Sequence, residues 1–91
     1  MITADSRPKL ARGVRLQIDR VRGGFNLLAP EHVLRVNASS AAILELCDGQ
    51  RSLADIVDVL ASRYAVDRGR IEREASALID DLVTRRLVER P

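Results

Sequence analysis

Few residues of this 91-residue chain could carry out chemistry, and those few do not converge on one site. The chain has one histidine, His32, and one cysteine, Cys47, to move a proton or act as a nucleophile. No CxxC pair, HExxH motif or carboxylate cluster has the spacing of a metal site. We therefore expect a protein that is not an enzyme and that binds no cofactor or metal of its own.

Each of the other features that look reactive has a simpler structural explanation. Gly23-Gly24 lacks the flanking residues of a phosphate-binding loop, so it predicts a tight turn. The carboxylates of Asp80 and Asp81 would point about 100° apart on a helix, and both lie outside its apolar stripe. Cys47 lies in an apolar helical stretch and predicts a buried small hydrophobe. His32, between a turn and a strand, is expected to be exposed or to cap the strand.

Composition limits the chain to one ordinary globular domain. Hydrophobic residues make up 46% of the chain and charged residues 31%, which is typical of soluble domains. No apolar run is long enough to span a bilayer, and the N-terminal residues lack the apolar centre of a signal peptide. We expect a cytoplasmic protein without a membrane partner.

The first third of the chain has the pattern of a β-meander. Residues 14–19 alternate apolar and polar, which predicts a half-buried strand. Gly23-Gly24 then turns the chain into a second strand at residues 25–29, and Pro30-Glu31 turns it into a third at residues 32–36. Residues 1–13 are polar and broken by proline and glycine, so they predict a flexible N-terminal segment before a single domain at residues 14–91.

From Asn37 the apolar period changes to that of helices. Asn37 can cap a helix running to Cys47. Ser52 begins a capping box for a second helix that reaches Tyr64, and Asp67 can cap a third helix with a long apolar stripe. Leu87-Val88 closes the chain as a short extended tail. The predicted fold is α+β, with a three-stranded antiparallel β-meander followed by a three-helix bundle, similar to a winged helix-turn-helix.

A winged helix-turn-helix fold suggests DNA binding as one of two functions. In a winged-helix transcription regulator, Arg68, Arg70 and Arg73 would face the DNA. Glu72 and Glu74 alternate with these arginines, and residues 37–91 carry eight basic against ten acidic side chains. Because phosphates demand an excess of positive charge, no nucleic-acid partner is expected and DNA binding remains the alternative.

The other function follows from the edge of the meander. The third strand, at residues 32–36, has one side unpaired, and such an edge offers backbone groups to an extended peptide. The simplest alternative is an edge guarded by Arg35 that binds nothing.

A family resemblance favours the peptide-binding hypothesis. The stretches that carry it are Leu27–Glu31, Val36-Asn37, Ala42–Leu44, Cys47–Gly49, the Ser52 helix and Leu82–Val88. In this order and spacing they resemble the PqqD family of pyrroloquinoline quinone (PQQ) biosynthesis, whose members are recognition elements for ribosomally made peptides. The likeness runs from about Arg7 to Glu89.

The resemblance implies a peptide chaperone that binds the precursor peptide PqqA by strand addition and delivers it to the radical S-adenosylmethionine (SAM) enzyme PqqE. Some family members are fused to PqqC, which makes PqqC a further possible partner. The iron–sulfur clusters belong to PqqE, because this chain lacks the cysteines to hold them. Related domains use the third strand and third helix as a groove. The corresponding peptide-binding residues are His32, Val33, Leu34, Arg35, Val36, Arg70, Ile71, Glu74, Ala75 and Leu78.

Overall fold

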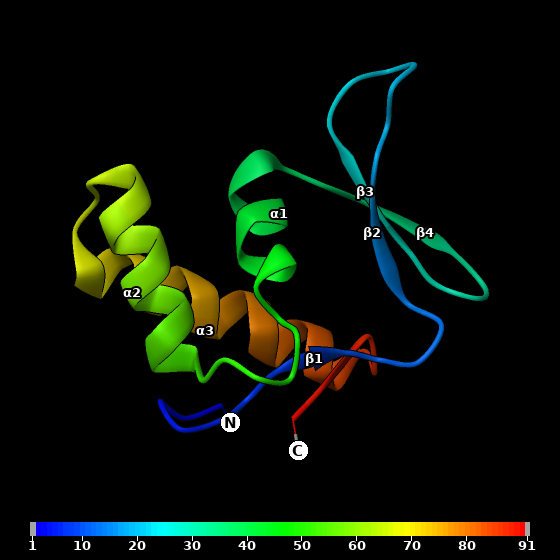
Figure 1. Ribbon diagram of the computed structural model, residues 1–91. Coiled ribbons are helices and arrows are strands. Elements are labelled where there is room, and N and C mark those ends of the chain that lie inside the picture. The colour runs from blue at the N-terminus through cyan, green and yellow to red at the C-terminus, as the bar shows by residue number, and fades with distance from the viewer. Residues whose placement is uncertain (1, 91) are drawn as a thin grey trace.

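The computed structural model of the chain, which describes residues 2–90, has an α+β fold with a small sheet beside three helices (Figure 1). The sheet consists of β2 (Arg15–Ile18), β3 (Phe25–Leu28) and β4 (Val33–Val36). These strands are antiparallel and hydrogen-bonded in the order β2-β3-β4. The expected three-stranded meander is confirmed, although each strand is slightly shorter than its sequence pattern predicts.

Three helices follow the meander, and each begins after the predicted cap. They are α1 (Ala38–Glu45), α2 (Leu53–Tyr64) and α3 (Arg68–Thr84). The side chains of Asn37, Ser52 and Asp67 each accept a hydrogen bond from an amide in the first turn of the helix that follows. Those amides have no partner within the helix, which is why the helices begin at these residues.

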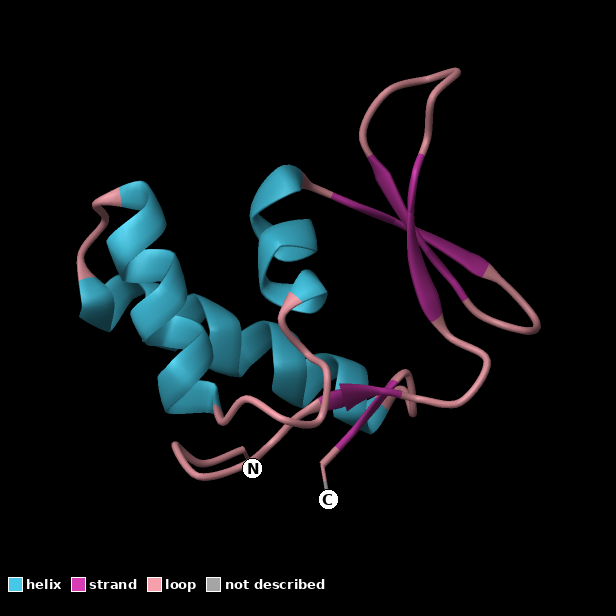
Figure 2. Ribbon diagram, in the orientation of Figure 1, coloured by secondary structure: helices cyan, strands magenta, loops and turns pink. Residues whose placement is uncertain are grey.

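The helix α1 lies between the sheet and the other two helices (Figure 2). Leu27, in the middle of β3, is completely buried against the helices, as are Ile56 of α2 and Ile79 of α3. Cys47 is also buried, as expected. The core is therefore one cluster shared by sheet and helices, and it fixes the position of β4 relative to α1 and α3.

The N-terminal residues differ from the flexible segment that the sequence predicts. Ile2 and Pro8 are buried, and the backbone amide of Ile2 donates to Oδ1 of Asp80 at 2.7 Å. Strand β1 (Lys9–Leu10) pairs antiparallel with β5 (Val88–Glu89), so the segment is tied to the end of the chain. A two-residue strand has no period for a sequence pattern to detect. The folded unit therefore includes residues 2–13.

None of the helices within residues 2–90 combines the length and the hydropathy needed to cross a membrane.

Candidate peptide-binding site

Strand β4 is an edge strand of the sheet. It pairs with β3 on one side, and no other strand within residues 2–90 pairs with its second side. The register sets Leu27 opposite Leu34, and Leu28 opposite Val33. An edge strand leaves every second backbone amide and carbonyl without a partner in the sheet. The edge can therefore accept a further strand.

The residues with free backbone groups follow from the hydrogen-bond alternation. The amide of Ala29 donates to the carbonyl of His32 at 2.9 Å, which makes these two residues a hydrogen-bonded pair. In an antiparallel ladder such pairs alternate with unbonded ones, so Leu34 and Val36 also bond to β3. The amides and carbonyls of Val33 and Arg35 consequently point to the open side.

The side chains of β4 point alternately to the two faces of the sheet, so they do not form a single binding surface. Leu34 and Val36 are half-buried and pack against the core. Val33 is 59% exposed, and His32 and Arg35 are also exposed. Because Leu34 and Val36 point inward, a strand added at the edge would meet the helices on that face of the sheet. The opposite face would present Val33 to the solvent.

Arg35 has a structural role besides its place on the edge. Its Nη1 lies 3.1 Å from Oδ2 of Asp19, and its Nη2 donates to the carbonyl of Gly23. Backbone and side-chain hydrogen bonds at Asp19, first the one from the Arg22 amide, hold the pKa of that carboxyl below its ordinary value. The side chain of Arg35 is thus held on the β2–β3 hairpin, and only its backbone amide and carbonyl are available to a strand added at the edge.

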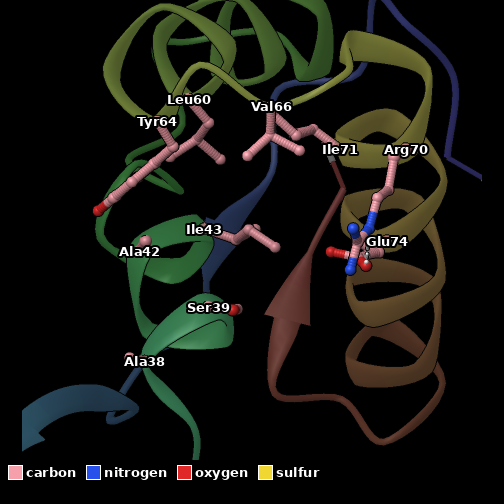
Figure 3. Close-up of a pocket in the computed structure, with 10 residues that line it drawn as sticks. All are labelled: Ala38, Ser39, Ala42, Ile43, Leu60, Tyr64, Val66, Arg70, Ile71 and Glu74. Atoms are coloured by element: carbon pink, nitrogen blue, oxygen red, sulfur yellow. Dashed lines mark hydrogen bonds and ion pairs between the residues drawn. The ribbon is translucent and has the colours of Figure 1, made fainter.

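A cavity of about 300 Å³ opens between α1, the end of α2 and the first half of α3 (Figure 3). Its walls are mostly apolar, and polar groups lie at its rim. Lining residues are Ala38, Ser39, Ala42, Ile43, Leu60, Tyr64, Val66, Arg70, Ile71 and Glu74. Figure 3 shows α1 on one side of the cavity and α3 on the other, with Ile43 and Val66 between them. The space suits one large apolar side chain of a ligand.

The residues predicted on α3 divide between this cavity and the core. Arg70, Ile71 and Glu74 line the cavity, and Arg70 Nε lies 3.2 Å from Glu74 Oε1. Ala75 is completely buried, so its methyl group belongs to the core. Leu78 is half-buried and packs against the core outside the cavity lining. The first half of α3 is therefore the part that faces open space.

The strand edge and the cavity are neighbours along the chain. Val36 ends β4, Asn37 caps α1, and Ala38 already belongs to the cavity wall. A ligand strand that follows β4 to its end can thus continue toward the cavity without crossing another element of the sheet.

The sequence analysis did not predict that α1 and the connection from α2 to α3 would line the cavity. Tyr64 is 53% and Val66 39% exposed, which is high for large hydrophobic residues. Ala65 between them has φ 52°, a left-handed conformation that ends α2 and turns the chain into α3. One feature of the sequence could have indicated these walls of the cavity. Two large hydrophobic residues, Tyr64 and Val66, flank the break between two helices, where polar residues are usual.

Two of the three arginines that would face DNA in the alternative function form ion pairs within the chain. Arg68 pairs with Asp58 of α2, and Arg70 pairs with Glu74 one turn further along α3. Such exposed pairs are weak, yet they lower the net positive charge of this surface. Across residues 2–90 no group of three or more His, Cys, Asp or Glu side chains has the arrangement of a metal site.

Comparison with solved structures defines the class of protein. The chain superposes with a TM-score of 0.85 on the solution NMR structure of the PqqD truncation of Methylobacterium extorquens PqqCD, at 34% identity, covering 99% of this chain and 96% of that one. That truncation is a stand-alone recognition element for ribosomally synthesised and post-translationally modified peptides, abbreviated RiPP. The chain is a RiPP recognition element in fold.

The family follows from sequence. Residues 25–88 match the family described as "Coenzyme PQQ synthesis protein D (PqqD)". The chain is 44% identical over 81 residues to a PqqA binding protein of Rhodopseudomonas palustris (strain TIE-1), covering 89% of this chain and 79% of the relative. A PqqA binding protein of Xanthomonas axonopodis pv. citri (strain 306) is 44% identical over 87 residues, or 96% of this chain and 95% of the relative. The chain belongs to the PqqD family, which is a non-catalytic peptide-binding family.

Proposed function

We propose that this chain binds a precursor peptide of the PqqA kind as an added strand on β4 and presents it to the radical SAM enzyme PqqE. The single observation that supports peptide binding most is the open edge of β4, where the backbone groups of Val33 and Arg35 have no partner in the sheet. Relatives that are 44% identical carry the name PqqA binding protein.

Backbone pairing and apolar burial together can supply the affinity. Two residues, Val33 and Arg35, offer up to four backbone hydrogen bonds, each worth about 0.5–1.5 kcal/mol net. The cavity beside α3 adds room for an apolar side chain, whose burial contributes roughly 1.5–3 kcal/mol. Ordering a flexible peptide costs several kcal/mol. The most favourable balance of these terms, about 7 kcal/mol, corresponds to a dissociation constant of roughly 10 μM, so micromolar binding requires the burial of a second apolar side chain of the peptide.

Specificity then depends on the side chains around the two parts of the site. The cavity favours a peptide with a large apolar residue, and Arg70 at its rim favours a carboxylate that can compete with Glu74 for the guanidinium. Delivery to PqqE requires that the enzyme reach the bound peptide. A peptide on the outer edge of the sheet meets this requirement, because one side of it stays uncovered.

An NMR titration of the ¹⁵N-labelled chain with the precursor peptide tests the site. The expected result is a set of large shift changes on β4 and the first half of α3, with the Val33 and Arg35 amides becoming protected from exchange. Shift changes confined to β2 or to the outer face of α2 would contradict the proposed groove. A coupled assay, in which PqqE acts on the peptide with and without the chain, tests presentation separately.

A further inference from the structure

Val33 leaves part of the open edge of β4 without charge. Its backbone amide and carbonyl face the open side, and its side chain points to the outer face of the sheet, where it is 59% exposed. Edge strands commonly protect such positions with charged side chains, and Arg35 is the charged residue that β4 carries. At Val33 the free backbone groups lie beside an exposed apolar side chain instead.

The outer face of the sheet carries two rows of side chains that differ in polarity where they reach β4. In the first row Val33 lies opposite Leu28 of β3, which is half-buried, so the row is apolar on both strands. In the second row Arg35 lies opposite Asn26, and both side chains donate to the carboxylate of Asp19. Both rows end at the open side of β4. The two outward positions of an added strand would therefore meet different surroundings.

An added strand places one of its residues directly beside Val33. An antiparallel ligand continues the pattern of the sheet, which is antiparallel in both of its pairings. In such a pair, a residue whose amide and carbonyl both face the partner exchanges two hydrogen bonds with one opposite residue. The side chains of the two residues point to the same face, with their Cβ atoms about 4.5–5.5 Å apart. The ligand residue that bonds to Val33 therefore contacts its side chain, and the one that bonds to Arg35 lies in the polar row.

We propose that Val33 determines part of the peptide specificity, because its side chain selects an apolar residue on the outward face of the added strand. The next outward position, beside Arg35, takes a polar residue. This inference rests on the proposed function, since it requires that the peptide pairs with β4, and it adds which side chains the edge accepts. The contact depends on a branched side chain with a methyl group, so threonine at position 33 would change it little, whereas a charged residue would disrupt it.

The two faces together define a four-residue pattern in the ligand. The ligand residues beside Leu34 and Val36 point inward with these half-buried side chains, toward the helices, so both are apolar. From the N to the C terminus of an antiparallel ligand, the positions beside Val36, Arg35, Leu34 and Val33 are apolar, polar, apolar and apolar. An ordinary amphipathic strand alternates throughout and would place a polar residue at the fourth position. The fourth position is thus the one that tests the role of Val33.

The test is a double-mutant cycle between Val33 and the peptide, measured by calorimetric titration of the full chain. Synthetic precursor peptides carry lysine at one position at a time, and each is titrated into the unaltered chain and into the Val33→Asp variant. At the position beside residue 33, lysine should weaken binding to the unaltered chain about three- to fivefold. The Val33→Asp variant should lose about as much affinity for the unaltered peptide and recover most of it with this lysine peptide, because the two new charges attract each other.

Val21→Asp is the matched control. It makes the same substitution at another exposed valine, in the loop at residues 19–24 between β2 and β3. This variant should bind every peptide within about twofold of the unaltered chain, because a distant exposed charge is screened by salt. A general effect of one added carboxylate is thereby excluded. The ¹⁵N spectra of both variants should match that of the unaltered chain away from the substituted residue, which shows that they are folded.

The outcomes separate this inference from the proposed function. If the peptide shifts the β4 amides but Val33→Asp rescues no lysine position, the peptide pairs with the edge and Val33 does not select its outward residue, so only this inference is overturned. A rescued position that holds a polar residue in the unaltered peptide also overturns it, because the preference for an apolar residue is then wrong. If the unaltered chain does not bind the peptide, or binds it without shift changes on β4, the proposed function is overturned and this inference with it.

Discussion

Arg35 of β4 and Asp19 at the start of the β2–β3 loop form an ion pair, with Nη1 and Oδ2 3.1 Å apart. The two residues are on the outer face of the sheet, and the pair joins the edge strand to the hairpin across β3. Asn26 of β3 is the residue opposite Arg35 and also donates to the Asp19 carboxylate. The conformation of the loop therefore depends on an arginine in the strand that is proposed to bind the peptide.

Replacing Asp19 by alanine should loosen the loop without unfolding the domain. The Val21 and Arg22 amides lose their acceptor, Oδ1 of Asp19, so their hydrogen exchange should become faster by at least tenfold. Exchange in the core at Leu27 and Ile79 should change little, since neither residue takes part in the hydrogen bonds to Asp19. Unchanged exchange at Val21 and Arg22 would show that the loop is ordered by other contacts.

The same network predicts a pH dependence. The pKa of Asp19 is lowered, mainly by the hydrogen bond from the Arg22 amide. A carboxyl whose pKa is depressed in the folded protein contributes stabilisation that is complete above its unfolded pKa and is lost as pH falls through its folded pKa. Loop order should therefore persist at pH 5 and disappear below the ordinary value of 3.8. The chemical shifts of the Val21 and Arg22 amides, followed from pH 6 to 2, measure the pH at which half of the loop order is lost.

Proline substitutions in β4 test the assignment of the open edge. Val33→Pro removes an amide that faces the open side, so peptide affinity should fall about two- to tenfold, as expected for one hydrogen bond worth about 0.5–1.5 kcal/mol. The melting temperature should change by a few degrees only. Val33→Thr keeps the amide and serves as the control, with nearly normal peptide binding.

Leu34→Pro should behave differently, because the amide of Leu34 bonds to β3 and its side chain packs on the core. Losing an internal ladder bond and a half-buried leucine should destabilise the domain by about 3 kcal/mol or more. Thermal unfolding followed by circular dichroism distinguishes the two variants. If Val33→Pro unfolds the chain and Leu34→Pro does not, the amide of Val33 bonds to β3 and the amide of Leu34 faces the open side, which is the reverse of the arrangement described.

Much of the fold could be predicted from the sequence because local signals agreed with tertiary packing. The alternation at Val14, Leu16 and Ile18 and the glycine pair after it indicated a hairpin, and the caps at Asn37 and Ser52 marked helix starts correctly. The sequence did not predict that the N-terminal segment pairs with the last strand. Pairing of β1 with β5 joins residues 9 and 89, and contacts so far apart in the chain leave no periodic pattern.

The candidate site was harder to predict, because a stripe at helical spacing does not distinguish core from rim. Ile71 and Ala75 lie four residues apart on one face, but Ile71 lines the cavity and Ala75 is completely buried. The difference depends on where the first half of α1 lies and where α2 turns into α3, and the residue spacing on α3 carries no information about either. Arg35 was predicted as a peptide contact, and its bonds to Asp19 and Gly23 arise only once the hairpin is folded.

Filling the cavity tests the role of α1 in peptide binding. Ala42→Phe places a large side chain into the cavity from α1, so an apolar residue of the peptide can no longer enter. Losing the burial of one such residue, roughly 1.5–3 kcal/mol, should weaken peptide binding about ten- to a hundredfold. Ala77→Phe on the exposed face of α3 is the control and should bind normally. Calorimetric titration with the precursor peptide measures both, and equal affinities would exclude the cavity from the site.

Cys47 should be chemically inert in the folded protein. Burial raises the pKa of its thiol to about 12, with a smaller contribution from the charge of Asp48, so almost no thiolate exists near neutral pH. The thiol also donates to the carbonyl of Ile43 within α1. We expect reaction with a disulfide reagent at pH 8 to be at least a hundredfold slower in buffer than in 6 M guanidinium chloride, measured by absorbance. Addition of saturating precursor peptide should leave the slow rate unchanged or reduce it, because binding stabilises the folded state from which the thiol is inaccessible. A rate in buffer close to that in denaturant would mean that the segment from α1 to α2 opens readily and that Cys47 is not enclosed by the core.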